Sequence, residues 1–70
     1  MDNTTKQGLL NEFQTMKLIE QDARDFYLKA SRDPSVTDQK VCSCLGKIAE
    51  DEGHHIELVD RIMTIVKNCL

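Results

Sequence analysis

The feature that most constrains the fold is a pair of long apolar stripes at helical spacing, separated by one break at Pro34. Steps of four and three residues along the first segment give one stripe, and the same steps along the second segment give another. No stretch alternates as a β-strand does, so the chain is predicted to be all-α, an antiparallel hairpin of two helices. The first stripe comprises Leu9, Phe13, Met16, Glu20, Ala23, Tyr27 and Ala30. The second comprises Val41, Leu45, Ile48, Glu52, His55, Val59, Ile62, Val66 and Cys69.

Both stripes are wider than the narrow band of a two-stranded coiled coil. A single hairpin cannot cover faces of this width, so two copies are expected to pair into a four-helix bundle. The chain length favours the same arrangement, because small scaffolds usually need disulfides, a metal or oligomerisation for stability. The residues that widen the stripes are Ile19, Phe26, Ala49, Ile56 and Met63.

Local signals place the boundaries of the hairpin. Residues 1–7 are polar and are expected to form a flexible N-terminal tail, and residues 8–70 are expected to form the hairpin. The first helix is expected to end near Ser31, because the residue before Pro34 is disfavoured in a helix. Asp33 is a candidate N-cap for the second helix, since proline is favoured at the first helical position.

Composition and charge exclude several classes of protein. Nine basic and twelve acidic residues give a net charge of −3, which excludes a basic nucleic-acid-binding surface. No apolar run is long enough to span a membrane, and the N-terminus has no apolar segment typical of a signal peptide. A cytoplasmic protein with reduced thiols at Cys42, Cys44 and Cys69 is therefore expected. An intersubunit disulfide or a redox role is the alternative for these thiols.

Three ionisable residues occupy positions in the middle of the apolar stripes: Glu20, Glu52 and His55. Burying an unpaired charge costs several kcal/mol, so something must compensate these groups. A metal ion would do so, because it takes carboxylate oxygen and imidazole nitrogen as ligands. The alternative is a buried polar network that fixes the bundle register.

The three residues fall at roughly one level of an antiparallel hairpin. Glu52 and His55 are spaced i, i+3 and share one helix face. If the helices were bounded by Ser31 and Asp38, the two arms would differ by about four residues, roughly 6 Å. The first helix is therefore expected to run somewhat past Ser31, or the second to begin irregularly. Two hairpins would pool four carboxylates and two imidazoles, and four negative charges would balance two divalent cations.

The sequences from Glu20 to Tyr27 and from Ile48 to His55 resemble the ferritin-like superfamily, in particular the rubrerythrin-type di-iron domain. The likeness covers about residues 9–66. Because the chain has one hairpin where that domain has two, it is similar to the half-size, encapsulated-ferritin-like proteins. The resemblance implies a homodimer or a ring of dimers with two iron ions per dimer, while the ligand types leave manganese and zinc open. It also implies an encapsulin-type shell as partner if a targeting tail beyond Leu70 has been removed.

The resemblance also implies a role for each residue of the site. Glu20 would be a terminal carboxylate ligand, Glu52 the carboxylate that bridges two irons, and His55 a terminal imidazole ligand. Tyr27 would be a phenol that hydrogen-bonds near the centre, and all four would be catalytic residues. The implied activity is iron oxidation (ferroxidase) with O2 or peroxide. The alternatives are rubrerythrin-like peroxide reduction, a non-catalytic metal-binding or oligomerisation module, and a metal-free four-helix interaction protein.

Overall fold

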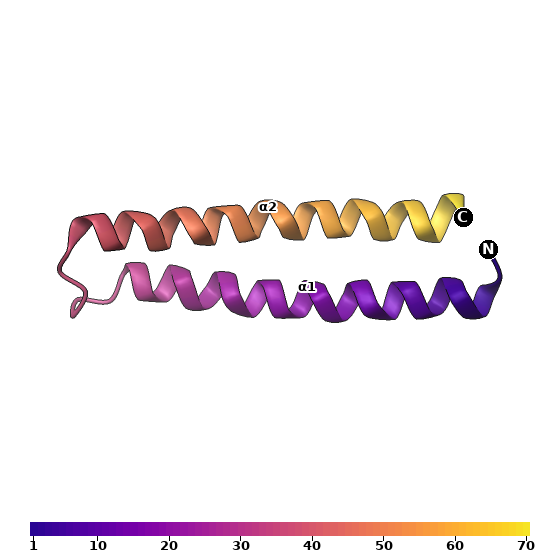
Figure 1. Cartoon of the computed structure of the whole chain (residues 1–70), viewed down its shortest axis with the longest axis horizontal. Coiled ribbons are helices and arrows are strands. Elements are labelled where there is room, and N and C mark those ends of the chain that lie inside the picture. Colours follow the sequence, from indigo (N-terminus) through magenta and orange to yellow (C-terminus); the bar gives the residue numbers. More distant parts are fainter.

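The computed structural model describes all 70 residues and consists of two α-helices, α1 (Asn3–Ser31) and α2 (Gln39–Cys69). The helices lie side by side in a rod of 52 × 15 × 10 Å, with the connection at one end and both chain ends at the other (Figure 1). This confirms the predicted all-α architecture of two packed helices. Neither helix combines the length and the apolar character needed to cross a membrane.

The first helix begins earlier than the sequence analysis expected. Asp2 caps α1, since its carboxylate accepts hydrogen bonds from the Thr5 backbone N–H at 2.7 Å and from the Thr5 hydroxyl at 3.2 Å. These two bonds, the backbone one first, hold the pKa of the exposed Asp2 carboxyl below its ordinary value of 3.8. The segment expected to be a tail, residues 1–7, is therefore helical from Asn3 onward.

The connection between the helices is built from side-chain caps. Asp33 does not cap α2: its carboxylate accepts hydrogen bonds from the Ser35 backbone N–H and the Ser35 hydroxyl, which lower the pKa of Asp33. The N-cap of α2 is Asp38, which accepts from the backbone N–H groups of Lys40 and Val41. The second helix thus starts later than an Asp33 cap would have placed it.

The expected mismatch between the two arms is absorbed by the connection. α1 ends at Ser31, followed by a tight turn in which the Arg32 and Asp33 N–H groups bond to carbonyls three residues earlier. The chain then continues past the end of α1 before it turns back, so that α2 begins beyond that end (Figure 1). Both helices are α-helical along their whole length, and Glu20 of α1 still lies level with Glu52 and His55 of α2.

The hairpin alone has a very small core. Only four residues are buried, Ala49, Ile56, Val59 and Val66, and all of them belong to α2. No residue of α1 is buried. The stripe of α2 that packs against α1 is therefore rotated from the predicted one, toward the flanking positions at Ala49 and Ile56. Two helices cannot enclose side chains on all sides, so a packed interior does not form within one chain.

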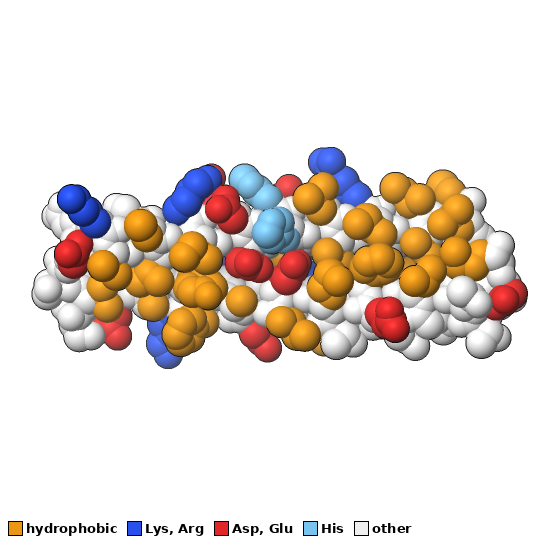
Figure 2. All heavy atoms as spheres, in the orientation of Figure 1, with side chains coloured by type: hydrophobic (Ala, Val, Ile, Leu, Met, Phe, Trp, Pro, Cys, Tyr) orange, Lys and Arg blue, Asp and Glu red, His pale blue; other side chains and the backbone are white.

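Among the apolar side chains that remain exposed, one group lies on a single face of the hairpin. We call it the apolar face. Figure 2 shows hydrophobic side chains spread over both helices, on either side of a central group of histidine and acidic side chains. Members that are seven residues apart on one helix lie in a common stripe. Its large members are Met16, Ile19 and Phe26 of α1 and Val41, Ile48 and Ile62 of α2, which are 39% to 68% exposed.

Candidate metal centre

The structure brings together the three ionisable residues that interrupt the apolar stripes. Glu20 comes from the middle of α1, and Glu52 and His55 come from successive turns of α2. One ligand-type atom from each, a carboxylate oxygen or an imidazole nitrogen, lies within 4.8 Å of the other two. The grouping predicted from the spacing is therefore present within one chain.

The three groups do not satisfy one another by hydrogen bonding. The closest approach between Glu52 and His55, from Oε1 to Nδ1, is 3.9 Å, which is too long for a hydrogen bond. Glu20 Oε2 is shielded from solvent and has no hydrogen-bond partner. Because a shielded carboxylate oxygen without a partner is costly, the cluster is not a completed polar network within the single chain.

The donor set fits a divalent metal ion. Carboxylate oxygen and imidazole nitrogen bind such ions at about 2.0–2.2 Å, so ligand atoms around one ion lie at most roughly 4.4 Å apart. A separation of up to 4.8 Å needs only small side-chain rotations to reach that range. The unpartnered oxygen of Glu20 is the kind of atom that a cation would satisfy.

The cluster lies in the middle of the apolar face, open to whatever covers that face. The Glu52 side chain is 22% exposed, whereas the His55 side chain is 55% exposed. Apolar side chains flank the central polar group toward both ends of the hairpin (Figure 2). The site is therefore open to solvent on the side of His55.

Basic side chains near the cluster were not identified from the sequence. Lys17, one turn before Glu20, forms an ion pair with Asp60 of α2, with 2.7 Å between Nζ and Oδ1. Arg24, one turn after Glu20, crosses toward α2, where a Cβ at Gly53 would lie 4.0 Å from its Cδ atom. Lys17 is three residues from Glu20 and Arg24 is four, and this helical spacing was the sequence signal that could have placed both beside the cluster.

Lys47 belongs to a separate ion pair within α2. Its ammonium group donates to Asp51 Oδ1 at 3.1 Å, one turn along the same helix. That hydrogen bond and the nearby charges of Asp51 and Glu50 raise the pKa of Lys47. Lys47 thus remains engaged with the exposed acidic run and does not join the two helices.

Tyr27 is not part of the cluster. It is half-buried two turns beyond Glu20, its ring packs edge-on against Phe26 at a centroid distance of 5.6 Å, and its hydroxyl makes no hydrogen bond within the chain. Its predicted role near a metal stays a prediction. Cys42, Cys44 and Cys69 are free thiols, and the Cys42 thiol donates to the Val36 carbonyl at 3.4 Å.

Comparisons of the chain with protein-family models, with curated proteins and with solved structures gave no match.

Proposed function

We propose that two copies of this chain pair through their apolar faces into a ferritin-like four-helix bundle that oxidises iron at a shared site. The observation that carries the proposal is the cluster of Glu20, Glu52 and His55, with the unpartnered Glu20 oxygen, in the middle of an otherwise apolar exposed surface. Charged groups in such a surface are costly unless they are compensated when the surface is covered.

Pairing of two chains is supported by the hairpin's small core. Six large apolar side chains on one face remain 39% to 68% exposed, and contiguous apolar surfaces of this kind mark interaction sites. Two copies bring four carboxylates and two imidazoles together, a Glu from each of two helices and a Glu-x-x-His from each of the other two. Four negative charges balance two divalent cations, so the paired site has no uncompensated charge.

In the proposed reaction Fe(II) is the substrate. Two Fe(II) ions give up one electron each, and one O2 takes both electrons and two protons to form H2O2. Glu20 and Glu52 supply the negative charge that attracts Fe(II) and favours the higher charge of Fe(III). His55 supplies a neutral imidazole ligand, and the covered apolar face excludes water. A reducing cytoplasmic setting, in which the three thiols stay free, is part of the proposal.

The proposal keeps Tyr27 as a phenol near the centre. Its hydroxyl has no partner in the single chain, which leaves it free to donate a hydrogen bond into the site of the paired form. Tyr27→Phe is expected to leave the metal content unchanged and to slow oxidation. If Tyr27→Phe oxidised iron at the same rate as the parent chain, Tyr27 would have no role at the site.

The deciding experiment adds Fe(II) to the purified chain without oxygen, admits air, and follows near-UV absorbance together with the metal content. About one iron per chain with rapid oxidation is the expected result. Glu20→Gln should lose both, whereas Glu57→Gln, an exposed carboxylate outside the cluster, should lose neither. Bound metal without oxidation would indicate that the chain only binds metal. Turnover only with peroxide would favour peroxide reduction. Absence of bound metal would refute the proposal.

A further inference from the structure

The two helices are joined by a single polar contact. Lys17 of α1 and Asp60 of α2 form the only ion pair between the helices, and no hydrogen bond joins any other residues of the two helices. Lys17 occupies a position that faces α2, and its side chain is only 24% exposed. Apolar packing does not account for an ammonium group at such a position.

Apolar packing alone fixes the axial position of α1 only weakly. α1 has no buried residue, and the four buried residues of α2 are all aliphatic. Apolar stripes that repeat every seven residues can pack in alternative registers, whereas a polar pair at a helix interface has one register in which it is satisfied. The Lys17–Asp60 pair forms in one axial position of α1 on α2 and therefore favours that position.

That axial position matters for the metal cluster because Glu20 is the only one of the three cluster residues that belongs to α1. A slip of one helical turn moves Glu20 by about 5.4 Å, more than the 4.8 Å within which the three ligand atoms now lie. Lys17 is one turn from Glu20 on the same helix, so the ion pair acts close to the ligand that it would hold.

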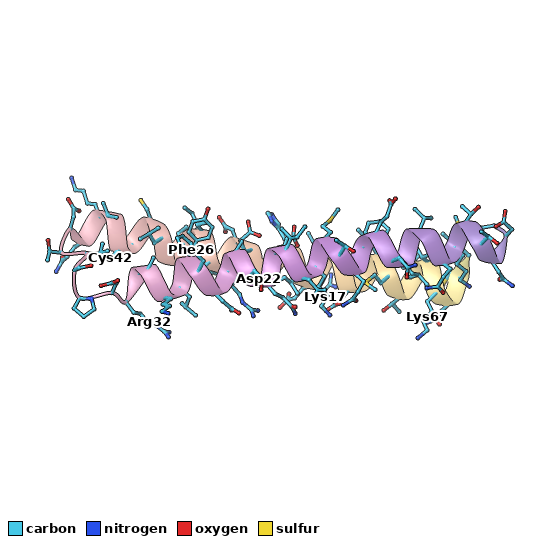
Figure 3. The ribbon with its side chains drawn as sticks, turned by 90° about the horizontal axis from the view of Figure 1, so that it is seen from below. Lys17, Asp22, Phe26, Arg32, Cys42 and Lys67 are labelled. Carbon is cyan, nitrogen blue, oxygen red and sulfur yellow. The ribbon has the colours of Figure 1, made fainter.

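The ion pair lies away from the apolar face. Figure 3 places Lys17 and Lys67 on one side of the hairpin and Phe26 on the other. A polar groove runs along the side of Lys17, lined by Gln14, Lys17, Asp60 and Lys67 among others. A partner on the apolar face would leave this groove, and the ion pair that lines it, uncovered.

We infer that Lys17 and Asp60 are positioning residues, which hold Glu20 in register with Glu52 and His55 so that the three can bind one metal ion. This inference rests on the proposed function. It assigns no catalytic role to either residue, because neither belongs to the ligand cluster.

The test is a Co(II) titration of the purified chain, in which the visible spectrum reports the ligand geometry and the titration gives the affinity. Lys17→Met should weaken Co(II) binding about threefold, as much as the loss of a part-exposed ion pair can change the preference for one register, and should alter the spectrum. Asp60→Asn should have the same effect, and the double variant should lose no more than either single one. Lys17→Arg, which keeps the pair, should restore the affinity.

Lys47→Met is the matched control, because it removes the same charge from an ion pair that lies within α2. It should leave the affinity and spectrum unchanged, and all variants should keep their helix content, since part-exposed ion pairs add little to folding. Equal Co(II) affinity in Lys17→Met and the parent chain, or an equal loss in Lys47→Met, would overturn the inference and leave the proposed function standing. Absence of Co(II) binding to the parent chain would overturn both.

Discussion

The apolar face leads to a quantitative prediction about self-association. Phe26 is its most exposed large side chain, at 68% of its full surface. A phenylalanine buries about 200 Å² when fully covered, so roughly 130 Å² remains to be covered by a partner. At about 25 cal/mol per Å² this corresponds to ~3 kcal/mol for each copy. Half-complete burial at both copies of a two-fold dimer gives the same ~3 kcal/mol in total.

Phe26→Ala should therefore raise the dissociation constant of the proposed dimer about 100-fold, since each 1.4 kcal/mol is a factor of ten. Sedimentation equilibrium over a wide dilution range measures this constant directly. Leu18→Ala is the matched control, since Leu18 is 53% exposed. It lies about 160° around α1 from Met16, about 100° from Ile19 and about 80° from Phe26, outside the arc that these three residues occupy. Its dissociation constant should match that of the parent chain.

Two results would refute this reasoning. One is a parent chain that stays monomeric at all concentrations tested. The other is a Leu18→Ala variant that is weakened as much as Phe26→Ala, which would mean that association does not use the apolar face. Loss of the edge-on contact between Phe26 and Tyr27 lowers the stability of the single chain by about 1 kcal/mol. A parallel urea titration separates that effect from association.

Three further predictions concern metal linkage, helix propensity and pH. Glu52→Ala should lose metal and weaken the oligomer, and identical size-exclusion profiles of metal-free and iron-loaded parent chain at every dilution would contradict this coupling. Gly46→Ala should stabilise the fold by about 1 kcal/mol in urea unfolding, because a Cβ there meets no atom within 4 Å; a destabilised variant would be the opposing result. The pKa of Asp2 is lowered by its bonds to Thr5, so its contribution to α1 is complete above the ordinary value of 3.8 and is lost as pH falls through the lower folded value. The Thr5 amide resonance should follow that titration in the parent chain and stay constant in Asp2→Asn, which caps without a charge.

The sequence was sufficient to predict the two helices and the grouping of Glu20, Glu52 and His55. Helical periodicity fixes which residues share a face, and one break near the middle of the chain forces the two helices to run antiparallel. These two facts bring the middle of one helix level with the middle of the other. No contact between individual side chains was needed for that prediction.

Other features depend on local competition that periodicity does not resolve. Asp33 and Asp38 are both suitable N-caps, and the choice of Asp38 follows from the use of Asp33 in a turn with Ser35. Likewise, the polar composition of residues 1–7 is typical of a flexible tail, whereas in the structure Asp2 caps a helix that begins at Asn3. Short polar side chains bond to nearby backbone in helices and in turns alike, so their presence alone does not decide between the two.

The rotation of α2 against α1 was also beyond prediction from sequence. Adjacent stripes of α2 are both apolar, one through Ala49 and Ile56 and one through Ile48 and Ile62, and either is suitable for packing. The structure packs the first against α1 and leaves the second on the apolar face. The Lys17–Asp60 pair was missed for a related reason, since a contact between residues far apart in the chain depends on that same rotation.

The two chain ends lie together at the end of the rod opposite the connection (Figure 1). A tandem gene duplication could therefore fuse two hairpins into one polypeptide, and the length of the joining segment would depend on how the hairpins are oriented. If both connections were at the same end, a few residues would suffice. If they were at opposite ends, the joining segment would have to run the full 52 Å of the rod, or about 15 extended residues. The length of the shortest joining segment that still gives a folded, metal-binding fusion would thus show which of the two orientations the hairpins adopt.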